Sequence, residues 1–254
     1  DWARAKWKGS FGSKYIHFGE KMAVRFADEI IVLNESTQAY FKEKYGSKTL
    51  FIPNGVTRPE TRPAQMIEKE FALTKDRYIL YLGRIVPEKG GYYLCEAFKK
   101  LHTDKKLVIA GGSSDSQEYF DELKRLAADD ARILFTGFVD GQLREELYSN
   151  AYAFVLPSDL EGMPLSLLEA MSYGNCVVTS DIEECTSVAE DCGLTFKKGD
   201  AEDLLRVLQE VCDQPQRVEQ MKKQVADFVC SKYNWNDIAA RTVEVYRHAR
   251  KQKG

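Results

Sequence analysis

The chain has 254 residues, 44% of them hydrophobic, which is enough to form the core of one large or two small domains. Its net charge of −3 argues against nucleic acid as a partner, because no overall positive charge is present to attract one. The longest apolar runs have the length of strands, so the sequence predicts no transmembrane helix, and it shows no secretory signal pattern.

The six cysteines and three histidines show no spacing typical of a metal site or a disulfide framework. No two cysteines form a Cys-x-x-Cys pair, and most lie in apolar stretches, as Cys176 does. We expect reduced, buried thiols in a cytoplasmic protein. The histidines, His17, His102 and His248, are far apart in the sequence, so we expect no metal and no bound cofactor.

Residues 1–25 carry six basic and two acidic side chains, interleaved with Trp2, Trp7, Phe11 and Tyr15. One interpretation is a segment that binds a membrane surface. The other is a helix that packs its aromatic residues on a neighbouring layer. We favour the packed helix, because the aromatic residues do not gather on one helical face.

Short apolar runs and helical patterns alternate over the next fifty residues. The predicted elements are a strand at 29–33, a helix to residue 45 with Ser36 or Thr37 as its N-cap and Gly46 beyond its end, and a strand at 49–52. Residues 57–74 contain two prolines and mixed charge without a strong period. We interpret them as a linker or an irregular surface segment at a domain boundary.

From Arg77 onward the alternation becomes regular. Strands are predicted at 78–82, 107–110, 133–136, 151–156, 176–179 and 193–196. Helices are predicted at 91–101, 116–128, 142–149, 164–173, 182–189, 201–212 and 216–230, with a last one from after Asn234 to about residue 250. Apolar strands that alternate with amphipathic helices indicate an α/β fold with a Rossmann-like, doubly wound parallel sheet. Ligands are then expected at the carboxyl ends of the strands.

Two glutamates bracket the turn after the 151–156 strand. Glu161 precedes the predicted helix, Glu169 lies on it, and Pro164 is predicted at the first helical position. Eight steps of about 1.5 Å would separate the two carboxylates by roughly 12 Å. That is too far for an acid/base pair acting on one bond. The spacing instead suits two hydrogen-bond acceptors at opposite ends of an extended, hydroxyl-rich ligand.

The alternative is an exposed loop acid at Glu161 and a solvated helix residue at Glu169. The neighbours of Glu169 are apolar, however, and a carboxylate in such a helix needs a partner. The free N–H groups at the start of the same helix form an anion site.

Two cations follow the first strand of the regular region. Arg84 and Lys89 flank a glycine-rich loop that leads into a helix. They are either surface charges paired with Glu88 or Asp104, or phosphate ligands. We favour phosphate binding, because both lie at the carboxyl edge of the predicted sheet.

An aromatic and an aliphatic residue, Phe138 and Val139, follow the strand at 133–136. They either form an apolar wall beside a flat base or pack in the core, and the sequence leaves both open. Two cations, two helix N-termini and two spaced carboxylates at one edge together indicate a site for a diphosphate flanked by two sugars, which is a nucleotide-sugar.

These motifs resemble those of the retaining glycosyltransferases of family 4, which have the GT-B fold. The resemblance rests on Gly83-Arg84 with Lys89-Gly90, on Gly137-Phe138-Val139 and on Glu161-x7-Glu169 around Gly162-Met163-Pro164. The first seven residues are further similar to a bacterial rhamnosyltransferase-like subgroup.

The resemblance implies a role for each motif residue. Glu161 would be the catalytic contact to the transferred sugar, and Glu169 would bind the ribose. Phe138 and Val139 would flank the base, and no metal would be needed. The donor diphosphate would be held by Arg84, Lys89 and the backbone of Gly162, Met163, Pro164 and Leu165.

The resemblance also implies a domain division: a remnant of an N-terminal acceptor domain at 1–52, a linker at 53–76, a donor-binding domain at 77–232 and a closing helix at 233–254. We therefore expect the donor-binding half of a GT-B glycosyltransferase. The acceptor would be a sugar or a lipid-linked sugar, with peripheral contact to the inner membrane face. A non-catalytic nucleotide-sugar-binding module is the main alternative, and an epimerase or phosphorylase of the same fold is a third.

Overall fold

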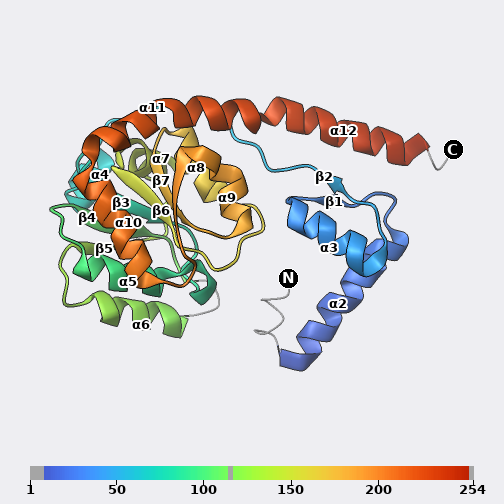
Figure 1. Ribbon diagram of the computed structural model, residues 1–254, viewed down its shortest axis with the longest axis horizontal. Coiled ribbons are helices and arrows are strands. Elements are labelled where there is room, and N and C mark those ends of the chain that lie inside the picture. Colours follow the sequence, from blue (N-terminus) through green and yellow to red (C-terminus); the bar gives the residue numbers. More distant parts are fainter. Residues whose placement is uncertain (1–8, 114–116, 252–254) are drawn as a thin grey trace. The chain divides into compact units, whose positions relative to one another are not determined.

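A computed structural model of the chain describes residues 9–113 and 117–251 (Figure 1). The chain divides into two compact units. A small unit combines Asp1–Asn54 with Trp235–Gly254, and a large unit spans Gly55–Asn234. The predicted membrane-surface or packing role of Trp2 and Trp7 lies outside the described residues.

The large unit is built on a sheet of six parallel strands in the order β5-β4-β3-β6-β7-β8. The strands are β3 (Tyr78–Leu82), β4 (Lys106–Ala110), β5 (Ile133–Gly137), β6 (Ala153–Leu156), β7 (Cys176–Ser180) and β8 (Gly193–Phe196). This confirms the predicted Rossmann-like, doubly wound sheet. The strand order reverses between β3 and β6, and ligands bind at such a reversal in sheets of this kind.

Successive strand residues point to opposite faces and so build two hydrophobic cores. In β3, Tyr78 and Leu80 enter one core while Ile79 and Tyr81 enter the other. The first core is covered by α4 (Met66–Phe71), α7 (Gly141–Asn150), α8 (Leu165–Ser172), α9 (Glu183–Ala189) and α11 (Pro215–Lys232). The second is covered mainly by α5 (Gly91–Lys100), α6 (Gln117–Ala127) and α10 (Ala201–Asp213) (Figure 1). The short 3-10 helices η1 (Pro87–Lys89) and η2 (Glu190–Cys192) lie in the connections.

The interpretation of residues 57–74 as a linker or irregular surface segment is wrong, because they contain α4 and belong to the large unit. Ile67 and Leu73 are buried in the core. The start of α4 is held from α7 by Glu146, whose Oε2 accepts the backbone N–H groups of Gln65, Met66 and Ile67 at 2.9, 2.7 and 3.2 Å. A side chain 80 residues away in the sequence thus accepts the amides that an N-cap side chain would otherwise accept.

The small unit contains α2 (Gly9–Phe26), β1 (Ile31–Val32), α3 (Glu35–Tyr45), β2 (Leu50–Phe51) and α12 (Trp235–Lys251). Its two strands are shorter than predicted. The N-cap of α3 is Asn34, not Ser36 or Thr37, because the Asn34 side chain accepts the Thr37 amide at 2.7 Å. Gly46 ends α3 in the left-handed conformation, as predicted.

Helix α2 does not pack Tyr15 on a neighbouring layer. The Tyr15 side chain is 74% exposed and that of Phe18 is also exposed, which contradicts the favoured interpretation for the aromatic residues that the structure describes. The side chain of Phe11 lies outside them. Contact between α2 and α3 runs instead through Glu20, which accepts the Tyr40 hydroxyl at 2.7 Å.

Candidate functional site

The loops after β3 and β6 touch each other at the reversal of strand order. Gly90 has φ +69°, and a Cβ atom on it would lie 1.8 Å from the Pro157 carbonyl oxygen. The Asp159 amide donates to the Glu88 carbonyl at 2.8 Å. This close approach brings the Lys89 ammonium to 2.5 Å from Glu161 Oε1. Two residues predicted at one sheet edge are therefore in direct contact.

Glu161 is not an exposed loop acid, since its side chain is only 7% exposed. Besides Lys89, it accepts the Ser158 hydroxyl at 2.7 Å. The Ser158 carbonyl in turn accepts the Ser180 hydroxyl at 2.5 Å, which ties the loop after β6 to the end of β7. Burial raises the pKa of the Cys185 thiol, and the negative charge of Glu161 raises this pKa further. The site thus presents a fixed, charged pair from two neighbouring strands.

Helix α8 starts one residue later than predicted. Pro164 is extended, with φ −76° and ψ 97°, and serves as the N-cap instead of the first helical residue. Its carbonyl accepts the amides of Leu167 and Leu168 at 3.1 and 3.2 Å, which is the role of an N-cap carbonyl. Pro164 makes no side-chain cap bond, so the amides of Leu165 and Ser166, which precede these two, remain for an anion. Proline itself has no N–H and contributes none.

The predicted need of Glu169 for a partner is confirmed. The Tyr148 hydroxyl donates to Glu169 Oε2 at 3.1 Å, and Arg144 Nη1 lies 3.7 Å from Oε1. Both partners come from α7. The Glu169 side chain is 35% exposed, so it remains accessible to a ligand.

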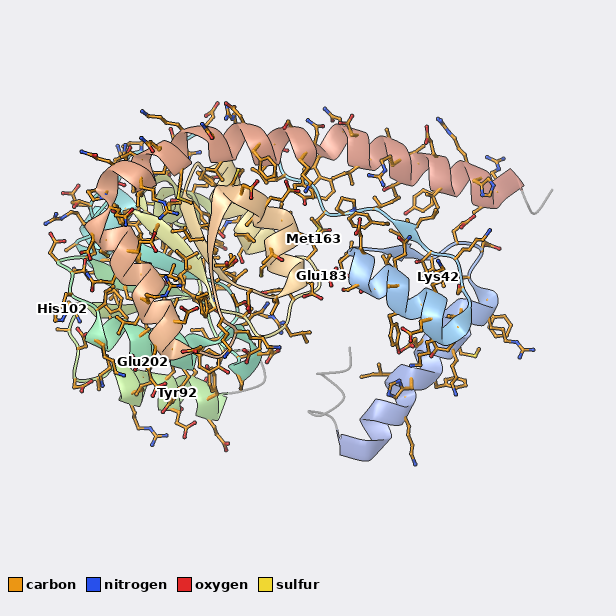
Figure 2. All side chains as sticks on the ribbon, viewed as in Figure 1. Lys42, Tyr92, His102, Met163, Glu183 and Glu202 are labelled. Carbon is orange, nitrogen blue, oxygen red and sulfur yellow. The ribbon has the colours of Figure 1, made fainter. Side chains whose placement is uncertain are left out.

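The structure separates the two residues predicted to flank a base. Val139 is buried and packs in the core, whereas Phe138 is 79% exposed. Arg84 is exposed, and its backbone carbonyl accepts the Tyr81 hydroxyl at 2.8 Å. Met163 precedes α8 and packs partly against the core; its side chain is labelled in Figure 2. Leu165, the first residue of α8, is half exposed.

Four side chains of this edge were not singled out in the sequence: Arg144, Tyr148, Ser158 and Ser180. Ser158 and Ser180 were detectable as small polar residues at the carboxyl ends of two predicted strands. Arg144 and Tyr148 stand four residues apart on a predicted helix, and that spacing places side chains on one face. Nothing in the sequence indicates that this face meets Glu169.

The described residues contain no group of three or more His, Cys, Asp or Glu side chains arranged to hold a metal ion. All six cysteines are free, and Cys95, Cys176 and Cys185 are buried. Burial raises the pKa of both Cys95 and Cys176 to about 12. Among the described helices, none has the length and apolar character that a membrane crossing requires.

Comparison with known families gives a match to the model described as glycosyl transferases group 1, over residues 64–228. The chain belongs to this family. The match covers most of the large unit, including both loops of the Lys89–Glu161 contact. Membership of the group 1 family agrees with the resemblance drawn from the motifs, at the level of the glycosyltransferase family and the GT-B type of fold.

An uncharacterized glycosyltransferase of Methanocaldococcus jannaschii is 32% identical over 187 residues, which are 70% of this chain and 47% of that protein. A glycogen synthase of Mycobacterium tuberculosis is 26% identical, with 96% of this chain and 60% of that protein covered. The crystal structure of Anabaena HepE in complex with UDP and glucose has a TM-score of 0.84 at 18% identity, over 91% of this chain and 66% of that one. The chain thus spans about half to two thirds of the length of these relatives.

Proposed function

We propose that this chain carries the donor site of a retaining glycosyltransferase, which transfers a sugar from a nucleoside diphosphate sugar to an acceptor. The observation that carries the proposal is the Lys89–Glu161 contact at the reversal of strand order, beside the start of α8. A cation, a carboxylate and free helix amides there match a ligand that has a diphosphate next to a hydroxyl-rich sugar.

The diphosphate would lie against Lys89, Arg84 and the first amides of α8. An ammonium has three donors, so Lys89 can keep its bond to Glu161 and still donate to a phosphate oxygen. Negative charge grows on the departing diphosphate during transfer, and fixed donors at that point stabilise the transition state. These protein groups would take the part that a metal ion plays in other transferases.

The two glutamates would define the two ends of the donor. Glu161, held by Lys89 and Ser158, would accept hydroxyls of the transferred sugar. Glu169 would accept the ribose hydroxyls, and the exposed ring of Phe138 would contact the base. The core position of Val139 leaves only its backbone for that contact. Glycogen synthase and other hexosyltransferase relatives favour a hexose, and a sugar or lipid-linked acceptor remains part of the proposal.

The first test is calorimetric titration of the chain with UDP, GDP and dTDP and with their sugars. UDP is the first choice, because the structurally similar Anabaena protein was solved with it. Binding of one nucleoside diphosphate, with sugar transfer by the complete gene product, is the expected result. Binding without transfer by the complete gene product would favour a non-catalytic nucleotide-sugar-binding module. If none of these nucleotides bound, both the glycosyltransferase hypothesis and the binding-module hypothesis would be wrong.

Two variants test the division between the glutamates. Glu169→Ala should weaken binding of the nucleoside diphosphate by about tenfold or more, as expected for a lost charged hydrogen-bond acceptor. Glu161→Gln should leave that affinity unchanged or tighten it, because Lys89 loses its anionic partner, and should weaken only the sugar-bearing donor. Glu202→Gln, which removes the partner of the surface residue Lys100, is the control and should change neither affinity. Equal losses from both site variants would contradict the assignment.

A further inference from the structure

Helix α7 supplies a partner to each oxygen of Glu169. The Tyr148 hydroxyl donates to Oε2 at 3.1 Å, and Arg144 Nη1 lies 3.7 Å from Oε1. Residues four apart on a helix share one face, so the two groups reach α8 side by side. A carboxylate has about four acceptor positions, and these two contacts leave room for further donors from a ligand.

Burial, ring stacking and a backbone hydrogen bond hold Tyr148 in place. Its side chain is 1% exposed, its ring stacks on Tyr173 with centroids 5.3 Å apart, and its carbonyl accepts the Asn175 side-chain amide at 2.9 Å. Burial and the Glu169 charge hold the pKa of Tyr148 well above its usual range, so the hydroxyl keeps its proton. That single proton has a second acceptor within reach, the Ser166 carbonyl at 3.4 Å, but the carboxylate is nearer and charged.

Arg144 differs from Tyr148 in being accessible. Its side chain is 43% exposed and its distance to Glu169 is that of an ion pair without a hydrogen bond. Its contribution is therefore the charge of the guanidinium, which offsets that of the carboxylate and attracts its Oε1 toward α7. An exposed pair of this kind contributes less than the partly buried hydrogen bond from the Tyr148 hydroxyl.

We propose that Tyr148 and Arg144 are positioning residues that hold Glu169 in the orientation needed to accept the 2′- and 3′-hydroxyls of a ribose. The inference rests on the proposed function and deepens it, because it predicts the substrate class. If the sugar of the nucleotide lacks these two hydroxyls, the oriented carboxylate loses its hydrogen-bond donors. Such a site discriminates strongly against the ligand without the hydroxyls. The donor is then a ribonucleotide such as a UDP- or GDP-sugar, and a deoxynucleotide donor such as dTDP is disfavoured.

The test compares the affinities of UDP and 2′,3′-dideoxy-UDP, or of the matching GDP pair where GDP is the ligand that binds. The ratio of the two affinities isolates the ribose contact, because damage to the fold lowers both. We expect the wild-type chain to prefer the ribonucleotide by about a hundredfold. Tyr148→Phe should reduce this preference about tenfold and Arg144→Gln about threefold, with Arg144→Lys closer to wild type.

Tyr152→Phe is the matched control. Tyr152 is also a buried tyrosine with a bonded hydroxyl, but it donates to the Val211 carbonyl at 2.8 Å in the other core. This variant should keep the wild-type preference. In a Glu169→Ala background, Tyr148→Phe should cause no further change, since it acts through the carboxylate.

The possible failures are distinguishable. A wild-type chain that binds neither UDP nor GDP overturns the proposed function, and this role with it. A chain that binds one of them while Tyr148→Phe keeps the full preference overturns only the positioning role. If Tyr148→Phe still changes the ribonucleotide preference in the Glu169→Ala background, the positioning role is also overturned.

Discussion

Gly90 determines how closely the loops after β3 and β6 approach each other. Its positive φ favours glycine, and its Cα lies so near the Pro157 carbonyl that a Cβ atom would overlap the oxygen at 1.8 Å. The same approach places Lys89 beside Glu161. A methyl group at Gly90 would therefore separate the cation from the carboxylate as well as strain the backbone.

Gly90→Ala should destabilise the chain by about 2–4 kcal/mol, from the left-handed backbone and the overlap together. It should also weaken UDP or GDP binding at least tenfold, because Lys89 moves. Gly174→Ala is the matched control: its φ is +82°, but a Cβ atom there would meet only the Lys222 carbonyl oxygen at 3.5 Å. The control should cost about 1–2 kcal/mol and leave nucleotide affinity unchanged. Urea unfolding and calorimetric titration measure both quantities, and equal losses of affinity would contradict the argument.

The sequence predicts which of these residues share an edge but not which of them touch. Lys89 and Glu161 each follow a strand, so a parallel sheet puts both at its carboxyl edge. Their contact depends on β3 and β6 being neighbours, and alternating strands and helices do not specify that order. The role of Tyr148 could not be predicted from the sequence for the same reason, because it depends on how α7 packs against α8. The need of Glu169 for a partner could be predicted, since a carboxylate among apolar neighbours requires one.

The short helix α4 depends on a carboxylate from another helix. Glu146 is fully buried, and besides the amides of Gln65 and of the first two residues of α4 it accepts the Gln142 side-chain amide at 2.8 Å. A helix of six residues is unstable alone, so its position relies on this bond and on the burial of Ile67. Three N–H groups, of which that of Ile67 is buried and the other two belong to partly buried bonds, would be left without an acceptor if the carboxylate were removed.

Glu146→Ala should therefore destabilise the chain by about 3–5 kcal/mol, because it breaks a buried network and leaves several donors unpaired. The adjacent Glu145→Ala is the control. Glu145 is partly exposed and pairs with the surface residue Arg62, so its loss should cost no more than about 1 kcal/mol. Chemical denaturation of the two variants compares them directly. Similar costs would show that Glu146 does not hold α4.

The same carboxylate predicts a pH dependence of stability. Burial raises the pKa of Glu146, but the bonds from Gln142 and the three amides outweigh it and lower the pKa below its ordinary value of 4.5. The stabilisation is therefore fully present above pH 4.5 and is lost as the pH falls from there toward the lowered value. Glu146→Gln should unfold with a smaller loss of stability between pH 6 and about 3 than the wild type. An unchanged pH profile in denaturation experiments would contradict this assignment.

Elements with a strong apolar pattern were predictable, and elements held by distant side chains were not. Strands such as β3 and β7 were located almost to the residue, because continuous apolar runs bounded by glycine or polar residues define them. Helix α4 lacks both length and a clear period. Cap positions failed for a local reason: Asn34, Ser36 and Thr37 are all residue types that cap helices, and only the backbone conformation decides at which of them α3 begins.

The two units differ in how much core they contain. In the part of the chain that the structure describes, the buried hydrophobic residues of the small unit are Val32, Ile52 and Ile238. The large unit has two extended cores on the faces of a six-stranded sheet. Local stability follows the number of buried apolar contacts, so the two units should open with different free energies.

Hydrogen exchange measured by mass spectrometry should show this difference. We expect the amides of β1 and β2 to exchange at least about a hundredfold faster than those of β3 and β6, which lie in the middle of the large sheet. Added UDP or GDP should protect residues 83–90 and 158–169 and leave β1 unchanged, because every residue of the proposed donor site belongs to the large unit. Lys89→Met provides the control, since its loss of phosphate binding should abolish the protection. Protection that appeared first in β1 or β2 would place the nucleotide elsewhere and contradict the proposed site.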